Sequence, residues 1–444
     1  MGMTIGLLAM SGVRVCDPEL LKIGLTLPGF VERSKVIASL PSLGLLTLAA
    51  LTPKAHRVRY FEAKDVAEAD ECFASLCECD LVAISSMTAQ IDEAYAIADR
   101  LRNNGTRVVL GGLHATALPK EGAQHADSVV SGEGEPVWPT VVADYEKKSP
   151  KPIYHTEGDY DLAYSPVPRY DLITIAKYNR LTVQTSRGCP HHCEFCASSI
   201  LLTPQYKQKP VSNVLREVDA IREIWDQPFI EFADDNSFVD RTYWRSLLPK
   251  LAERKIRWFA ETDVSVARDS ELLDMMRDAG CAQLLMGFES PNREGLQGIE
   301  LRSDWKTKQW PRYHDIVRSV QERGISVNGC FLVGLDAHGT GIFDDIFNYV
   351  RDLGLHQVQV TIQTPFPGTR LYERLNASKR LLEPDNWKLC TLFDLNYQPS
   401  QMSPDELRSG FRELVARLYA DREIQERRGR FRRMMRAGYA ARHA

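Results

Sequence analysis

The chain has 444 residues, which is too long for a single hydrophobic core, so two or three domains are expected. Apolar residues make up 44% and charged residues 26% of it, which is ordinary for a globular protein and excludes an intrinsically disordered one. The 55 basic and 59 acidic residues nearly balance, so no nucleic acid is expected as a partner.

The N-terminal stretch "MGMTIGLLAMSGVRV" carries a short apolar run, with no basic region before it and no small-residue cleavage site after it. It is expected to form a first strand rather than a secretion signal. No apolar run approaches the length that spans a bilayer. We therefore expect a cytoplasmic protein, in which the ten cysteines are metal ligands or buried thiols rather than disulfides.

Short apolar runs alternate with helical patterns over residues 1–147. Strands are expected at 4–9, 57–61, 81–85, 107–110 and 128–130. A helix is expected from Thr88 to a left-handed cap at Gly105, with an apolar face made of Ile91, Tyr95, Ala98 and Leu101. This alternation predicts a doubly wound, Rossmann-like α/β domain that binds ligands beyond the carboxyl ends of its strands.

Periodicity is absent from residues 148–178, where four prolines interrupt the chain, and this segment is predicted to be an interdomain linker. Regular patterns return over 179–388. Six further strands are expected at 181–185, 229–232, 257–261, 284–288, 327–333 and 357–363. Helical patterns separate them, so the segment is expected to be a partial (βα)6 barrel of the TIM type, whose active site lies on the loops after the strands.

Residues 389–444 are predicted to be a C-terminal helical extension. One amphipathic helix is expected there, with a stripe formed by Leu407, Phe411, Leu414 and Leu418. An Arg-rich tail follows, with eight arginines and two glutamates from Arg422 onward. Such a tail fits either contact with anionic lipid or a helix that covers the rest of the protein.

The stretch "TSRGCPHHCEFCA" places Cys189, Cys193 and Cys196 directly after the first strand of the expected barrel. Thiolates suit zinc or iron-sulfur clusters, and a 4Fe-4S cluster normally takes four of them. Three thiolates would leave one iron open to a further ligand. The alternative is a zinc knuckle with His191 or His192 as the fourth ligand.

The spacing C-x-x-x-C-x-x-C, the aromatic Phe195 and the position after strand one resemble the radical S-adenosylmethionine (SAM) superfamily. In that family the open iron is chelated by SAM, whose cleavage gives a 5′-deoxyadenosyl radical. Motifs at later strand ends, "FADDNSF", "FAETD", "LLMGFES" and "FLVG", are similar to its SAM-binding motifs. The resemblance implies SAM binding by Phe195, Asp234, Asp235, Asn236, Glu261, Gly287, Glu289, Ser290 and Gly334.

A doubly wound domain before such a barrel resembles the cobalamin-binding members of the superfamily. The segments "AISSMT", "LGGLHAT" and "SGEGE" lie where that family holds the corrin and its nucleotide tail. The residues concerned are Ser85, Ser86, Met87, Gly111, Gly112, His114, Gly132, Glu133, Gly134 and Glu135. Paired glycines let the backbone approach a bulky ligand, although they also make tight turns. The motif D-x-H-x-x-G, which supplies a lower cobalt ligand elsewhere, is absent after strand one.

The resemblance implies a C-methyltransferase that acts on a small molecule, lipid or tetrapyrrole, with a 4Fe-4S cluster, SAM and cobalamin as cofactors. One SAM would methylate cobalamin, and a second would generate the radical that activates the substrate carbon. A flavodoxin or ferredoxin is expected to supply electrons. Two alternatives stay open: a cobalamin-dependent cyclase or rearrangement enzyme without net methylation, and a non-catalytic cobalamin or redox sensor. The tail resembles that of hopanoid methylases, which implies peripheral membrane contact.

Overall fold

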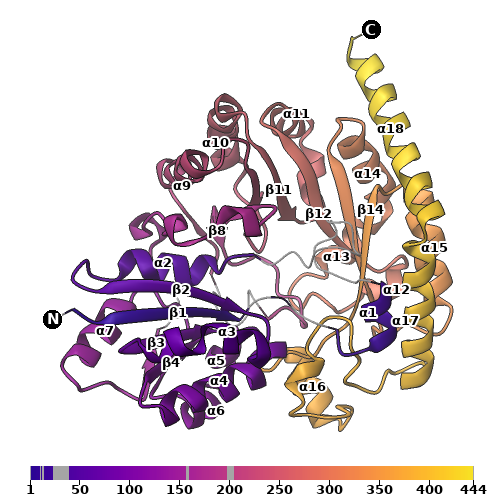
Figure 1. Ribbon diagram of the computed structural model, residues 1–444. Helices are drawn as coiled ribbons and strands as arrows, with labels where there is room; N and C mark the ends of the chain where they lie inside the picture. Colours follow the sequence, from indigo (N-terminus) through magenta and orange to yellow (C-terminus); the bar gives the residue numbers. More distant parts are fainter. Residues whose placement is uncertain are drawn as a thin grey trace.

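The computed structural model describes residues 2–10, 12, 15–23, 40–156, 160–197 and 205–443. Two parallel sheets, each of six strands, are built from successive parts of the described chain (Figure 1). The stretch after the first strand, where the lower cobalt ligand motif is missing, lies partly outside the described residues.

The first sheet has the strand order β2-β1-β3-β4-β5-β6, and all of its pairings are parallel. Its strands are β1 (Thr4–Met10), β2 (Arg57–Ala63), β3 (Leu81–Ser85), β4 (Arg107–Gly111), β5 (Ser128–Ser131) and β6 (Ile153–His155). Strand order reverses between β1 and β3, as expected for a doubly wound domain, and such a reversal opens a crevice at the carboxyl ends. The expected α/β fold is therefore confirmed.

Helices cover both faces of the first sheet because apolar residues line both sides of its central strands. One face carries α2 (Leu43–Leu51) and α7 (Trp138–Glu146). The other carries α3 (Val66–Cys77), α4 (Ile91–Asn103), α5 (Leu113–Ala117) and α6 (Pro119–His125). The predicted stripe of α4 is buried, and Gly105 follows its end with a left-handed φ of 85°.

Strand β6 lies inside the segment that the sequence analysis assigns to the linker. Its three residues pair with β5 from Val129↔Ile153 to Ser131↔His155 and extend the sheet. A strand of this length gives no periodic signal, because only the central Tyr154 is buried. The rest of the described segment contains only the short 3-10 turns η2 (Leu162–Tyr164), η3 (Tyr170–Leu172) and η4 (Ile175–Lys177).

The second sheet follows chain order, with β7 and β14 at its two edges, so the barrel is open. Its strands are β7 (Leu181–Val183), β10 (Phe229–Phe232), β11 (Arg257–Thr262), β12 (Cys281–Glu289), β13 (Ser326–Val333) and β14 (Gln357–Ile362). The main helices outside it are α9 (Val211–Ile224), α10 (Arg241–Arg254), α11 (Ser270–Asp278), α14 (Tyr313–Gln321) and α15 (Ile342–Leu353). This arrangement confirms the predicted partial (βα)6 barrel.

Alternation along the barrel strands separates two environments. Residues such as Ile230, Trp258 and Ala260 pack outward in the large core shared with the helices. Their neighbours Glu231 and Glu261 lie on the opposite, inner side of the strands. A small antiparallel pair, β8 (Ser186–Arg187) with β9 (Lys207–Gln208), extends from the end of β7 towards the first domain.

The C-terminal extension consists of α17 (Pro404–Leu418) and α18 (Asp421–His443). The predicted stripe of α17 is buried, and Ser403 with Glu406 forms a capping box at its start. Helix α18 runs along the outside of the barrel beside α14 and α15 (Figure 1), where Phe431 stacks on His356 at 4.2 Å between ring centroids. Within the described chain, no helix is both long and apolar enough to cross a membrane.

Candidate active site at the interface of the two domains

The three cysteines lie on a loop that leaves β8 and crosses the carboxyl end of the barrel. Cys193 pairs with Glu300 in an isolated antiparallel bridge, and the neighbouring Glu194 donates its N–H to the carbonyl of Ile299 at 2.9 Å. The Glu300 carboxylate accepts backbone N–H bonds from His192, at 3.3 Å, and from Ser303, at 2.7 Å. Although burial opposes it, these bonds lower the pKa of Glu300 to about 2, so it holds the loop as an anion.

The protonation of the thiols depends on their burial. Burial raises the pKa of Cys189 to about 11, and the nearby thiol of Cys196 contributes to this rise. Burial also raises the pKa of Cys193 to about 12 against the attraction of Lys306. Metal ligation requires thiolates, and only the positive charge of a metal centre stabilises them at such a position. Three sulfurs on one loop, close enough to influence one another's pKa, fit a 4Fe-4S cluster with one open iron.

The zinc alternative has less support from the geometry. His191 is already engaged, because its Nε2 lies 3.2 Å from Asp263 and its ring stacks on Trp305 at 4.4 Å between centroids. Among the described residues, no three His, Cys, Asp or Glu side chains converge on a position for a single metal ion.

The motif after β10 faces the start of the cysteine loop, because β10 and β7 are neighbours in a parallel sheet. Asp234 accepts N–H bonds from Thr185, at 2.7 Å, and from Ser186, at 2.9 Å, and a hydroxyl bond from Thr185 at 2.5 Å. Asp235 accepts the N–H of Gly188 at 2.7 Å. These carboxylates therefore hold the loop that carries the cysteines. Their contact with SAM stays a prediction.

Asn236, the third polar residue of this motif, lies beside the first cysteine. Its Nδ2 donates to Asp263 at 2.8 Å and reaches the sulfur of Cys189 at 3.8 Å. Its Oδ1 accepts the N–H of Asp263 at 3.1 Å. The side chain thus joins the ends of β10 and β11 to the cysteine loop.

The end of β12 combines three features that the sequence analysis singled out only in part. Glu289 has a left-handed φ of 64°, unusual for a residue with a side chain, next to a bulge in the pairing with β13. Its carboxylate binds the buried Lys306 at 2.6 Å. A Cβ on Gly287 would lie 2.4 Å from Glu289 Oε1, so a larger residue there would displace the Glu289 carboxylate. Lys306 was missed because neither lysine of "WKTKQW" belongs to a motif that indicates a buried ion pair.

Glu261 lies on the inner side of β11. Burial raises its pKa to about 8, and the nearby carboxylates of Glu231 and Asp235 add to this rise. At neutral pH Glu261 is therefore largely protonated and can donate a hydrogen bond as well as accept one.

Three other residues assigned to SAM binding have structural partners. The hydroxyl of the fully buried Ser290 lies 3.1 Å from Nε2 of His338. Gly334 has a φ of 84°, and its carbonyl accepts the hydroxyl of Tyr397 at 2.7 Å. Phe195 packs at the edge of the barrel core.

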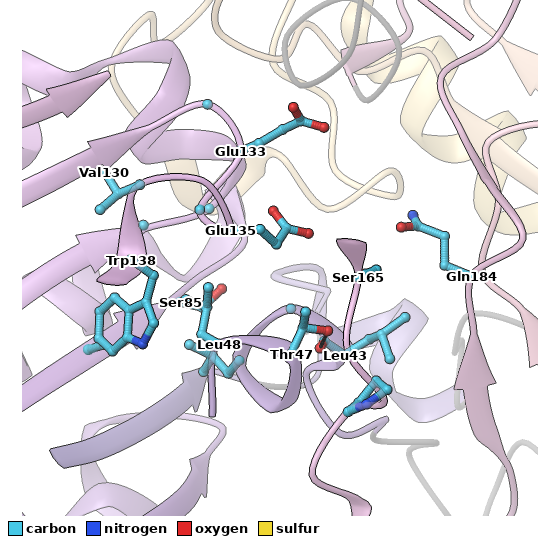
Figure 2. A pocket seen from close by; sticks show the side chains of 18 of the residues that line it. Leu43, Thr47, Leu48, Ser85, Val130, Glu133, Glu135, Trp138, Ser165 and Gln184 are labelled. Atoms are coloured by element: carbon cyan, nitrogen blue, oxygen red, sulfur yellow. Dashed lines mark hydrogen bonds between the residues drawn. The ribbon is translucent and has the colours of Figure 1, made fainter. Parts of the chain in front are cut away.

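A cavity of about 570 Å³ lies at the carboxyl edge of the first sheet and reaches the barrel. Its deep part lies between the sheet and the helices α2 and α7, where Ala83, Val109, Val130 and Trp138 line it. Figure 2 shows Trp138 and Val130 on one side, Leu48 and Thr47 of α2 below them, and Gln184 of the barrel opposite. The volume is in the usual range for a ligand site.

The lining of this cavity fits a bulky ligand with a buried tail. Ser85, Met87, Gly111, Gly112, Gly132 and Gly134 all line it, and their contact with the corrin and its nucleotide stays a prediction. Gly112 and Gly132 have left-handed φ values of 104° and 93°, and a Cβ on Gly132 would come within 2.4 Å of Thr156. Small side chains on the strands and backbone at the rim thus leave a cradle that larger residues would fill.

Two of the predicted cobalamin residues do not line the cavity. His114 lies on α5 with its side chain fully buried, its Nε2 is 3.1 Å from Glu121, and its ring meets that of Trp387 edge-on. The helix that starts after Gly112 turns this histidine away from the strand ends, towards the layer of helices. Ser86 is also buried, and its hydroxyl donates to the carbonyl of Met87 at 2.9 Å.

Glu133 and Glu135 line the cavity, but their carboxylates are paired across the domain interface. Arg187 of β8 binds Glu133 and Glu135 at 2.7 Å each, and Lys207 of β9 binds Glu133 at 3.0 Å. Although burial opposes it, Arg187 lowers the pKa of Glu135. These glutamates therefore tie the two domains together at the cavity rim.

The sequence analysis missed about two thirds of the residues that line the cavity. Those from α2, α7, the segment before β7 and the barrel include Leu43, Thr47, Leu48, Trp138, Ser165, Pro168, Gln184, Arg187 and Lys209. The apolar run "LGLLTLAAL" could have indicated a buried helix, but nothing in it indicates a ligand.

Three family models match this chain in order. Residues 33–142 match the B12 binding domain, residues 183–339 the radical SAM superfamily, and residues 369–444 a domain of unknown function named DUF4070. The chain thus carries a B12-binding domain followed by a radical SAM domain, and its cysteine loop lies at the mouth of the barrel.

Relatives of similar length are methyltransferases by name. The chain is 25% identical over 392 residues to bacteriochlorophyllide d C-12(1)-methyltransferase of Chlorobaculum tepidum, and this match covers 87% of this chain and 84% of that protein. It is 25% identical over 402 residues to hopanoid C-2 methylase of Rhodopseudomonas palustris, and this match covers 88% of this chain and 73% of that protein.

Solved structures agree on the fold. The radical SAM methyltransferase TsrM from Kitasatospora setae, solved with cobalamin and a 4Fe-4S cluster, has a TM-score of 0.70 at 14% identity, covering 99% of this chain and 100% of that one. The cobalamin-dependent SAM radical enzyme OxsB has a TM-score of 0.68 at 14% identity, covering 92% and 66%.

Proposed function

We propose that the protein is a cobalamin-dependent radical SAM methyltransferase that places a methyl group on an unactivated carbon of a small-molecule, lipid or tetrapyrrole substrate. The observation that best supports this proposal is that the two candidate cofactor sites lie next to each other. Arg187 lines the cavity of the first domain and lies two residues before Cys189. Relatives that match most of the chain methylate a bacteriochlorophyllide or a hopanoid by name, which supports methyl transfer to carbon.

When bound, the cluster with SAM supplies a radical that activates a carbon, and cobalamin supplies the methyl group. The residues of this chain would hold and shield these groups. Cys189, Cys193 and Cys196 would hold the cluster on a loop fixed by Glu300. Glu261, largely protonated on the inner side of β11, would be able to donate a hydrogen bond to a ligand there.

Water is excluded chiefly by the apolar walls of the cavity. Leu43, Leu48 and Trp138 surround its deep part, so a tail buried there exchanges water contacts for apolar ones. The strand-edge glycines leave the backbone close to the ligand, where N–H and C=O groups fix its orientation.

The decisive experiment follows the methyl group. Anaerobically reconstituted protein, loaded with hydroxocobalamin, is incubated with methyl-labelled SAM, a reductant and candidate substrates, including a chlorophyllide and a hopanoid. We expect 5′-deoxyadenosine together with a product that has gained labelled CH2. Release of 5′-deoxyadenosine with an unmethylated, altered product would instead show a cyclase or rearrangement enzyme. An intact cluster that never cleaves SAM would show a sensor.

Two partners belong to the same proposal. We propose a flavodoxin or ferredoxin as the electron donor, as the cluster chemistry of the family requires. We also propose peripheral contact with anionic lipid through the outer face of α18, where Arg428, Arg432 and Arg436 follow one another at four-residue spacing and are exposed. Met435 and Tyr439, which are 38% and 61% exposed, lie on the same face.

The inner face of α18 is used by the protein itself. The buried Arg427 donates to the carbonyl of Leu418 at 2.7 Å, and Arg430 donates to that of Arg351 at 2.6 Å. Sedimentation with vesicles of neutral lipid, with and without an anionic lipid, tests the outer face. Replacing Arg428, Arg432 and Arg436 together by Gln should abolish binding to the anionic vesicles, and equal sedimentation of the triple variant would contradict it.

A further inference from the structure

Arg187 is the centre of a hydrogen-bond network between the two domains. Its Nη1 donates to Glu133 at 2.7 Å, and its Nη2 donates to Glu135 at 2.7 Å. Its Nε and Nη2 also donate to the side-chain oxygen of Gln184, at 3.2 and 2.8 Å. The planar guanidinium is thus bound along three directions, which fixes its position more firmly than a single ion pair would.

This network is largely shielded from solvent. The side chain of Arg187 is 16% exposed, and those of Glu133 and Glu135 are 2% and 10% exposed. Glu133 also accepts bonds from Lys207 and from the N–H of Tyr160, each at 3.0 Å. Charges buried in this way gain little net stability over apolar packing. Their main effect is on geometry, because each partner has one arrangement that satisfies the others.

Each end of the network reaches a cofactor site. Glu133 and Glu135 alternate with Gly132 and Gly134, which line the cavity of the first domain. At the other end, Arg187 is followed by Gly188, whose N–H is held by Asp235, and then by Cys189. A ligand that holds the glycine loop in this arrangement therefore also holds the guanidinium, and through it the first residues of the cysteine loop.

We propose that Arg187 is a positioning residue that couples the two cofactor sites, so that cobalamin and the cluster each bind more tightly when the other is present. The proposal rests on the proposed function only in taking these two groups as the ligands. By thermodynamic linkage the effect is reciprocal, so it can be measured from either side. Neither site needs the substrate for this measurement.

The test compares the affinity for hydroxocobalamin, measured by absorbance titration under anaerobic conditions, in protein with and without the reconstituted cluster. We expect wild type to bind at least fivefold more tightly when the cluster is present. In Arg187→Gln the ratio of the affinity with the cluster to the affinity without it should fall to about one. Far-ultraviolet circular dichroism checks that this variant is folded. Iron retention, measured with and without hydroxocobalamin, should show the same dependence in wild type and lose it in the variant.

Arg254→Gln is the matched control. Arg254 binds Asp219 through two contacts of 2.7 Å on the outside of the barrel, between α9 and α10, and its side chain is 19% exposed. This variant loses a comparable ion pair far from the cavity, so its ratio should equal that of wild type. If Arg187→Gln does not fold, Glu135→Gln replaces it, because it removes one charge of the network and should lower the ratio at least twofold.

The outcomes separate the proposal from the function it builds on. A wild-type affinity that is the same with and without the cluster overturns the coupling alone, and so does a ratio that persists in Arg187→Gln. No hydroxocobalamin binding by wild type at all overturns both the cofactor assignment and the coupling.

Discussion

Asp234 gives the sharpest test of how the cysteine loop is built. The sequence analysis assigns it to SAM binding, whereas the structure shows its carboxylate bonded to Thr185 and Ser186 through three hydrogen bonds. Both of these residues are fully buried, and Asp234 is 3% exposed. The two roles differ in their consequences, because a structural role affects the protein without SAM and a binding role does not.

The cost of Asp234→Ala can be estimated from the bonds it removes. Two backbone N–H groups and one hydroxyl would lose their acceptor, and each buried donor left unsatisfied costs about 1–3 kcal/mol. The hydroxyl can rotate to another acceptor, so we expect a loss of about 3–5 kcal/mol in the free energy of unfolding. Removal of a buried carboxylate, whose pKa is raised by burial, offsets part of this cost. Asp234→Asn keeps an accepting oxygen and should cost about 1–2 kcal/mol.

Urea unfolding of the cluster-free protein measures this loss. The fluorescence of Trp244 and Trp258, both buried in the barrel, reports the transition. With a slope of about 2–3 kcal/mol/M, the midpoint of Asp234→Ala should fall by about 1–2 M. Asp240→Ala is the control on the same loop, because it removes only the N-terminal cap of α10, a bond of 3.0 Å to Tyr243, and should cost about 1 kcal/mol. An unchanged midpoint for Asp234→Ala, with weaker SAM binding after reconstitution, would refute the structural role.

Three further predictions follow from the same site. Cys193→Ala should lose most of its iron and abolish 5′-deoxyadenosine formation while retaining hydroxocobalamin, and full iron content in this variant would contradict the assignment of the cluster. Ala83→Leu should weaken hydroxocobalamin binding at least tenfold with iron content unchanged, because Ala83 is 4% exposed and lines the deep cavity. The pKa of Glu261 is about 8 in the folded protein against an ordinary 4.5, so the cluster-free protein should lose stability as the pH rises between these values. Glu261→Gln removes this pH dependence, so its free energy of unfolding should exceed that of wild type by about 1–3 kcal/mol at pH 8 but not at pH 4.5. Urea titrations at the two pH values measure this difference.

Local patterns were sufficient for the architecture. Strands β3 and β10 begin and end where their apolar runs do, and the stripe of α17 is buried as its spacing predicts. These elements follow from periodicity, because a sheet face or a helix stripe must be buried wherever it occurs. Strand β6 was missed because three residues cannot carry a period, and its place in the sheet depends on its partner β5.

The residues of the site were predictable to different degrees, according to how they act. Cys189, Cys193 and Cys196 could be selected from the sequence because three thiols at short spacing are typical of a metal centre, and their role as cluster ligands stays a prediction. Gly111 and Gly132 could be predicted for a related reason, since the strand ends of a parallel sheet converge on one edge. His114 shows the limit of this reasoning, because one turn of helix rotates it away from that edge.

Only the tertiary structure decided which side chains that are distant in the sequence form ion pairs. Arg187 meets Glu133 over 54 positions of sequence, and Lys306 meets Glu289 inside the barrel mouth. Such pairs carry no local signature, because a charged residue has the same sequence pattern whether it faces water or a buried partner. The sequence was therefore sufficient to predict the two folds and the candidate ligands of the cluster. The packing of one domain on the other decided how the two cofactor sites are joined, since that contact forms between segments that are distant in the chain.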